Sequence, residues 1–153
     1  MLKLSIRNGD IDCIQSVLSL PGRTIKSKQY YKGFDEWLSG KVIPNIGVNR
    51  DVISCRCKKY DTLLGFAVIK YGDENKLCNL SPMVDGVGLT QALLESSHLF
   101  FTSDYSIDVP LINDTTRLRN KLLSMGFDQL DTNISNDNTN QITYKKARNI
   151  CWI

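Results

Sequence analysis

The sequence predicts an α+β fold in which helices flank a central mixed, mostly antiparallel sheet. Short segments of alternating polar and apolar residues recur along the chain, a pattern typical of half-buried strands. Other segments carry apolar residues at spacings of three and four, which is typical of amphipathic helices. In chain order the predicted elements are β-α-α-β-β-β-α-β-α-β-β, which favours a layered domain built on one sheet.

A strand, two helices and a meander of three strands are predicted in the first half of the chain. Leu2, Leu4 and Ile6 alternate with polar residues and predict a strand that ends at Asn8. Gly40 and Pro44 are expected to end the second of two helices. The remaining elements predicted in this half are helices at 11–18 and 30–38, and a meander of strands at 53–57, 63–69 and 77–80.

The second half begins with a clear amphipathic helix. Apolar or small residues recur from Leu89 to Phe100 at helical spacing, and a strand is predicted at 105–109. A last helix at 118–125 ends at Gly126, where a left-handed residue is expected. Residues 131–141 are almost entirely polar and predict a hairpin loop, and a final strand follows at 142–144.

Composition limits the classes to which the protein can belong. Its 153 residues, 42% hydrophobic and 23% charged, fit a single globular domain spanning 1–153 and exclude a wholly disordered chain. The net charge is only +3, and the sequence lacks the dense basic stripe of a protein that binds duplex DNA. No apolar run long enough for a transmembrane helix occurs, and residues 1–10 lack the apolar region of a secretory signal. We therefore expect a cytoplasmic protein that does not bind membranes.

The cysteines indicate reduced thiols rather than a metal site. There are five of them, an odd number, and none is spaced as CxxC. Cys55 and Cys57 are expected to share one face of a strand and to pack as small hydrophobes. His98 is the single histidine, so a tetrahedral zinc site lacks ligands, and no metal is predicted.

A Gly-x-Gly sequence lies between a predicted strand and a predicted helix. Gly86 and Gly88 would let the backbone approach an anion, and the first N–H groups of the helix would point at it. The pair also fits an ordinary turn, and both interpretations stay open at this point. A third glycine is missing and no Gly-Lys-Ser/Thr follows, which excludes a dinucleotide fingerprint and a P-loop.

The wider context resembles the GCN5-related N-acetyltransferases, the GNAT superfamily. Three antiparallel strands run into residues 83–94, as in the acyl-CoA site of that family, where Arg/Gln-x-x-Gly-x-Gly/Ala holds the pyrophosphate. The strand at 106–109 and the closing Met125-Gly126-Phe127 fit as well. The resemblance covers roughly residues 50–127 and implies the GNAT fold.

This resemblance implies an acetyl-CoA-dependent N-acetyltransferase, in which an amine attacks the thioester directly within a ternary complex. Acetyl-CoA would be the co-substrate, and the acceptor would be an unidentified amine on a small molecule or a macromolecule. The residues expected to bind the cofactor are Leu80, Ser81, Asp85, Gly86, Val87, Gly88, Leu89, Thr90 and Asn113. The catalytic candidates are Asp108 as a base, with Tyr105 and Tyr144 as proton donors; Glu36 and His98 are further candidates for the base.

Some positions depart from the family pattern and support an alternative. Met83 and Asp85 stand where basic or amide side chains are usual, and Leu122 replaces a tyrosine that donates a proton to the thiolate. A degenerate module that binds acyl-CoA or a macromolecular partner without catalysis is therefore the second hypothesis. The basic, aromatic stretch 23–32 would suit nucleic acid or an acidic acceptor, or it is a solvated loop. A homodimer is left open.

Overall fold

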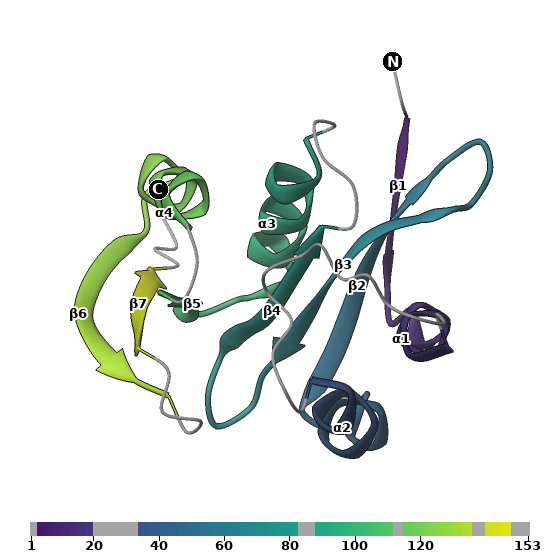
Figure 1. Ribbon diagram of the computed structural model, residues 1–153, viewed down its shortest axis with the longest axis horizontal. Coiled ribbons are helices and arrows are strands. Elements are labelled where there is room, and N and C mark those ends of the chain that lie inside the picture. The colour runs from purple at the N-terminus through teal and green to yellow at the C-terminus, as the bar shows by residue number, and fades with distance from the viewer. Residues whose placement is uncertain (1–2, 20–33, 83–87, 112–114, 136–139, 148–153) are drawn as a thin grey trace.

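Seven strands form one sheet in the order β1-β2-β3-β4-β5-β7-β6. Every neighbouring pair is antiparallel except β4 and β5, which are parallel. In Figure 1, β1 to β4 form the right part of the sheet, and β5, β7 and β6 form the left part. The mixed, mostly antiparallel α+β fold predicted from the sequence is confirmed.

The computed structural model describes residues 3–19, 34–82, 88–111, 115–135 and 140–147. The elements are β1 (Leu4–Asn8), α1 (Ile11–Ser19), α2 (Phe34–Trp37), the π-helix η1 (Leu38–Val42), the 3₁₀-helix η2 (Ile43–Asn45), β2 (Arg50–Cys57), β3 (Leu63–Lys70), β4 (Lys76–Pro82), α3 (Leu89–Phe100), β5 (Tyr105–Pro110), α4 (Thr116–Ser124), β6 (Asp128–Ile134) and β7 (Asn140–Lys146).

Each face of the sheet has its own hydrophobic core. On one face, Leu93 of α3 and Leu122 of α4 pack with Ile107 and Tyr144 of the sheet. On the other face, α1, α2 and η1 cover β2 and β3, with Phe66 fully buried. The strands alternate between the two faces because successive side chains of a strand point in opposite directions.

The predicted core thiols occupy this sheet. Cys55 and Cys57 are both buried in the core of the α3 face, as their spacing on a strand predicts. Burial raises the pKa of Cys55, and it raises the pKa of Cys13, a fully buried residue of α1, to about 12. These thiols therefore stay protonated at neutral pH and pack as apolar groups.

Two predicted boundaries were wrong. The second helix does not end at Gly40 but continues through η1, because Leu38 and Val42 are both fully buried one turn apart. Residues 131–134, predicted as loop, belong to β6. All side chains of β6 are exposed, so the strand carries no alternating apolar signal, and its backbone pairing with β7 holds it in the sheet.

A buried ion pair ties the start of α1 to β2. The Asp10 carboxylate accepts hydrogen bonds from Ser54 Oγ at 2.5 Å and Arg56 Nε at 2.9 Å. Its side chain is only 7% exposed. Burial raises the pKa of Asp10, but the hydrogen bonds from Arg56 and Ser54 outweigh this effect and hold the pKa below its ordinary value.

Asp10→Ala is expected to lower the free energy of unfolding at neutral pH by about 3 kcal/mol, because the largely buried Arg56 would lose its partner. The folded-state pKa of Asp10 is depressed, so its stabilisation is complete above the ordinary value of 3.8 and is lost as the pH falls through the folded value. Urea unfolding at a series of pH values should therefore show the gap between wild type and variant narrowing in acid.

The matched control is Asp12→Ala, which removes an exposed carboxylate from the first turn of the same helix. Its expected cost is below about 1 kcal/mol, the usual size of a helix-dipole effect. A gap between wild type and Asp10→Ala that stays constant across the acid range would show that the ionised carboxylate of Asp10 does not contribute to stability.

Candidate active site

Strands β4 and β5 separate soon after they begin. Their parallel pairing consists of Lys76 with Ser106 and Leu77 with Ile107. Both strands continue beyond this point, β4 to Pro82 and β5 to Pro110, without further pairing between them in the part of the chain that the structure describes. The sheet is therefore split from the level of Asp108 toward the carboxyl ends of the two strands; we call the point of separation the vertex.

A β-bulge in β4 coincides with the vertex. Val68 of β3 pairs with Asn79 and Ile69 pairs with Leu77, so Cys78 is an extra residue in β4. A bulge bends its strand and increases the local twist. The bulge thus lies where β4 turns away from β5. It could not be predicted from the sequence, because no glycine or proline marks it.

Helix α3 begins at the carboxyl side of β4. Gly88 precedes it with φ +71°, a left-handed conformation, and a Cβ placed on Gly88 would meet no atom within 4 Å. Gly88 has no side chain that could cap the first turn, so the N–H groups of Leu89 and Thr90 receive no side-chain acceptor from the N-cap residue. An open helix N-terminus of this kind has the polarity that favours an anion.

The remaining residues expected to bind the cofactor are placed as follows. Leu80 is buried on the α3 face, and Ser81 lies next to it in β4, where it pairs with Phe66. Leu89 is also buried in this core, while Thr90 is partly exposed. Asp85, Gly86, Val87 and Asn113 lie outside the described residues.

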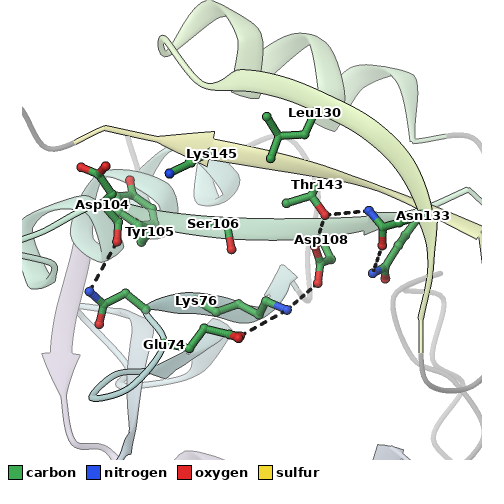
Figure 2. A pocket seen from close by; sticks show the side chains of 12 residues that line it. Glu74, Lys76, Asp104, Tyr105, Ser106, Asp108, Leu130, Asn133, Thr143 and Lys145 are labelled. Carbon is green, nitrogen blue, oxygen red and sulfur yellow. Dashed lines mark hydrogen bonds and ion pairs between the residues drawn. The ribbon is translucent and has the colours of Figure 1, made fainter.

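Asp108 lies at the vertex on the face opposite α3. Its carboxylate pairs with Lys76 Nζ at 2.6 Å and accepts a hydrogen bond from Thr143 Oγ1 at 2.5 Å. Asn133 donates to Thr143 at 2.9 Å, and Gln141 donates to Asn133 at 2.8 Å. Figure 2 shows this chain of contacts crossing from β4 over β5 and β7 to β6.

The carboxylates of Asp108 and Glu74 keep Lys76 in its charged form. Burial lowers the pKa of Lys76, but the hydrogen bond and charge of Asp108, together with Glu74 at 3.5 Å, raise the pKa above its ordinary value. Lys76 therefore remains an ammonium at neutral pH. A carboxylate offers about four acceptor positions, so Asp108 keeps about two for other donors.

A hollow of about 450 Å³ opens beside Asp108 on this face of the sheet. Most of its lining residues are polar: Glu74, Asp104 and Asp108 contribute carboxylates, and Lys76 and Lys145 contribute cations. Figure 2 shows the side chains of Asp108, Thr143 and Lys76 along its wall. A small polar molecule could contact Asp108 in this hollow.

Neither a protein-family model nor the sequence of a curated protein matches the chain. In three dimensions the chain matches 81 chains of solved structures. A Desulfovibrio desulfuricans protein assigned to the GNAT family of acetyltransferases superposes with a TM-score of 0.67, at 13% identity, over 96% of this chain and 100% of its own.

Two other matches agree. The ribosomal-protein-S18-alanine N-acetyltransferase from Escherichia coli has a TM-score of 0.66 and 16% identity, covering 98% of this chain and 97% of its own. A Bacillus anthracis protein assigned as a streptothricin acetyltransferase, solved with acetyl coenzyme A, has a TM-score of 0.53 and 10% identity over 65% and 62% of the two chains. The chain has the GNAT fold.

Within this GNAT fold, the two predicted tyrosines belong to the core of the α3 face, opposite the face of Asp108, although Tyr105 also borders the hollow that Asp108 lines. Tyr105 is buried at the beginning of β5, where β4 and β5 are still paired, and its ring stacks on Phe101 at 4.3 Å. Its hydroxyl lies 2.9 Å from Nδ1 of His98. The structure does not bring Tyr105 or His98 to the open part of the split sheet, so both fit a packing role.

Tyr144 lies closer to the vertex but on the α3 face. It pairs with Ile107 of β5, is fully buried, and donates its hydroxyl to Gln129 Oε1 at 3.2 Å. Leu122, which stands where the GNAT resemblance expects a tyrosine, is also fully buried in this core. Glu36 is exposed on α2.

The described residues contain no group of three or more His, Cys, Asp or Glu side chains placed to hold a metal ion. Within the same residues, no helix has the length and hydrophobicity needed to cross a bilayer. The polar groups near the vertex are the ammonium of Lys76, the carboxylate of Asp108, the hydroxyl of Thr143 and two amides, and such groups suit proton transfer and hydrogen bonding.

Proposed function

We propose that the protein is an N-acetyltransferase that transfers the acetyl group of acetyl-CoA to an amine by direct attack. The observation that carries the proposal is the position of Asp108, a carboxylate at the vertex where β4 and β5 separate. The GNAT fold supports the same conclusion, since its neighbours include acetyltransferases and one of them was solved with acetyl coenzyme A.

Acetyl-CoA would bind on the side of the sheet where α3 begins. The open N-terminus at Gly88, with Leu89, Thr90 and residues 85–87, would hold the pyrophosphate through backbone N–H groups. Leu80 and Ser81 would line the part of β4 along which the pantetheine lies. Asn113 is proposed as a further contact to the cofactor.

Asp108 would serve the attacking amine. A protonated amine that enters the hollow beside Asp108 can donate a proton to a free acceptor site of the carboxylate. The lone pair of the amine nitrogen then becomes available for attack. The amine nitrogen then forms a bond to the thioester carbon and loses its extra proton, the carbon–sulfur bond breaks, and CoA leaves with the electron pair as a thiolate that takes up a proton. Holding both reactants at the split sheet supplies much of the rate by proximity.

Binding without catalysis is the second candidate function. One observation favours it: Leu122 fills the core where the resemblance expects a proton-donating tyrosine, and the hydroxyl of the nearest tyrosine, Tyr144, is bonded to Gln129. Such a module would bind acyl-CoA, or a macromolecular partner, and would release no CoA. A module that binds acyl-CoA therefore differs from the transferase in turnover and not in cofactor binding.

A two-stage experiment tests the proposal. Because a ligand that binds only the native state raises the melting temperature, acetyl-CoA and CoA should raise it and NAD should not. Release of free CoA is then measured with a panel of primary amines. Turnover with any amine supports the transferase, and a thermal shift without turnover supports the binding module. Absence of any shift at millimolar acetyl-CoA would refute the transferase and the acyl-CoA-binding module, and would leave only a module that binds a macromolecular partner.

A further inference from the structure

A row of basic residues crosses the sheet on the face that carries Asp108. Arg50 of β2 pairs with Lys70 of β3, and Lys70 pairs with Lys76 of β4. Directly paired residues on neighbouring strands project to the same face and lie close together. We call Arg50, Lys70 and Lys76 the basic row; it continues through Ser106 to Lys145 of β7.

Only one end of the basic row is neutralised. Lys76 pairs with Asp108 and Glu74, whereas Arg50 and Lys70 form no ion pair within the described ranges of the chain. Arg50 Nε is buried and has no hydrogen-bond partner there. Like charges placed opposite each other on neighbouring strands destabilise a sheet, so this arrangement has an energetic cost that an anion would remove.

The basic row is close to the vertex. The positive charges of Arg50, Lys76 and Lys70 all act on the Cys78 thiol, the bulged residue of β4, although burial raises the pKa of this thiol overall. The row lies on the face covered by α1 and α2, whereas α3 packs on the opposite face. The phosphates of a cofactor bound at the start of α3 are therefore not the anion that Arg50 and Lys70 would neutralise.

We propose that Arg50 and Lys70 bind an anionic group of the acceptor, so that the acceptor is an amine that also carries a carboxylate or a phosphate. This inference rests on the proposed function, because Asp108 would hold the amine of the same molecule. Lys70 and Asp108 are two strands and two residues apart, or about 12 Å at the backbone. A short peptide spans such a distance, whereas a single amino acid is too short.

Isothermal titration of the full chain, saturated with CoA, tests this proposal with triglycine and triglycinamide. The two peptides share an amine and differ in the charge of the other end. We expect triglycine to bind about tenfold more tightly or better, since charge-assisted hydrogen bonds to Arg50 and Lys70 are available to its carboxylate alone. Aminohexyl phosphate is the second anionic probe. Whether triglycine or aminohexyl phosphate binds more tightly indicates whether the anionic group of the acceptor is a carboxylate or a phosphate.

The variant Arg50→Gln/Lys70→Gln should bind triglycine and triglycinamide equally. Lys59→Gln is the matched control, since Lys59 is exposed in the turn at the other end of the same β2–β3 hairpin, and it should keep the preference. If the double variant does not fold, as judged by its thermal melt, Lys70→Gln alone replaces it and should reduce the preference.

Three results would overturn the inference: equal affinity of the wild type for the two peptides, an undiminished preference in the Arg50 and Lys70 variants, or no binding of any of the three probes at millimolar concentration. Failure of the proposed function looks different. In that case triglycine binds with the expected charge preference, but acetyl-CoA yields no free CoA with triglycine or with any other amine tested.

Discussion

Gly88→Glu is expected to abolish measurable binding of acetyl-CoA. The side chain would enter the open space beside Gly88 and bring a carboxylate to the N-terminus of α3, where the proposal places the pyrophosphate. The glutamate side chain would repel the pyrophosphate by its charge and would also occupy the space that the pyrophosphate needs. Calorimetric titration with acetyl-CoA measures the loss, which should exceed about a hundredfold in Kd, or more than about 2.7 kcal/mol.

A control is needed because Gly88 has φ +71°, a conformation in which any L side chain is strained. Gly88→Gln carries the same strain and nearly the same volume but no charge, so the difference between the two variants isolates the electrostatic effect. Both should unfold cooperatively, since a Cβ at this position meets no other atom within 4 Å. Wild-type affinity in Gly88→Glu would mean that the Gly-x-Gly is an ordinary turn.

The elements around the site could be predicted from the sequence because each one is encoded locally. The periodicity of 89–100 gives α3, and the alternation of 105–109 correctly places Asp108 on the face opposite Ile107. Gly126 takes the predicted left-handed conformation, with φ +87°, after α4. Each of these features is determined by residues that are close to one another in the chain, so the pattern of side chains is enough to predict it.

The partners of Asp108 could not be predicted, because they depend on register between distant strands. Lys76 and Thr143 lie 32 and 35 residues from Asp108 in the chain and meet it only after β4, β5 and β7 have aligned. A shift of one residue in either pairing would turn the side chains of that strand to the other face of the sheet. The polar network therefore depends on the register of distant strands, which the sequence does not mark.

The same dependence on register explains the basic row. Arg50, Lys70 and Lys76 belong to three strands, and each reads in the sequence as an ordinary charged residue at a strand end. Sequence analysis therefore looked for a basic partner-binding surface in residues 23–32, the densest basic stretch, which lies outside the described residues. The pairing of β2, β3 and β4 brings the three cations of the basic row side by side. Basic residues that are far apart in the sequence can therefore form one anion-binding surface, which the local density of charge along the chain does not indicate.

Asp108→Asn is expected to lower kcat for acetyl transfer by about 10²–10⁴, the usual contribution of a general base, while the Kd for acetyl-CoA stays unchanged. Asparagine keeps the size of the side chain and an oxygen for Lys76 or Thr143, but it cannot accept the proton of the amine. Kinetics are measured with the amine that gives the fastest CoA release in wild type. The control is Asp131→Asn, which removes an exposed carboxylate from β6 and should leave kcat within about twofold.

The pH dependence separates catalysis by Asp108 from a purely structural role. If Asp108 accepts the proton of the amine, the rate of Asp108→Asn should increase with pH toward the wild-type rate, because solvent then supplies the unprotonated amine. If Asp108 only holds Lys76 in place, the variant should melt at a lower temperature and lose the same fraction of activity at every pH. Wild-type kcat in a stable Asp108→Asn would remove Asp108 from the mechanism and assign the base to another residue at the vertex.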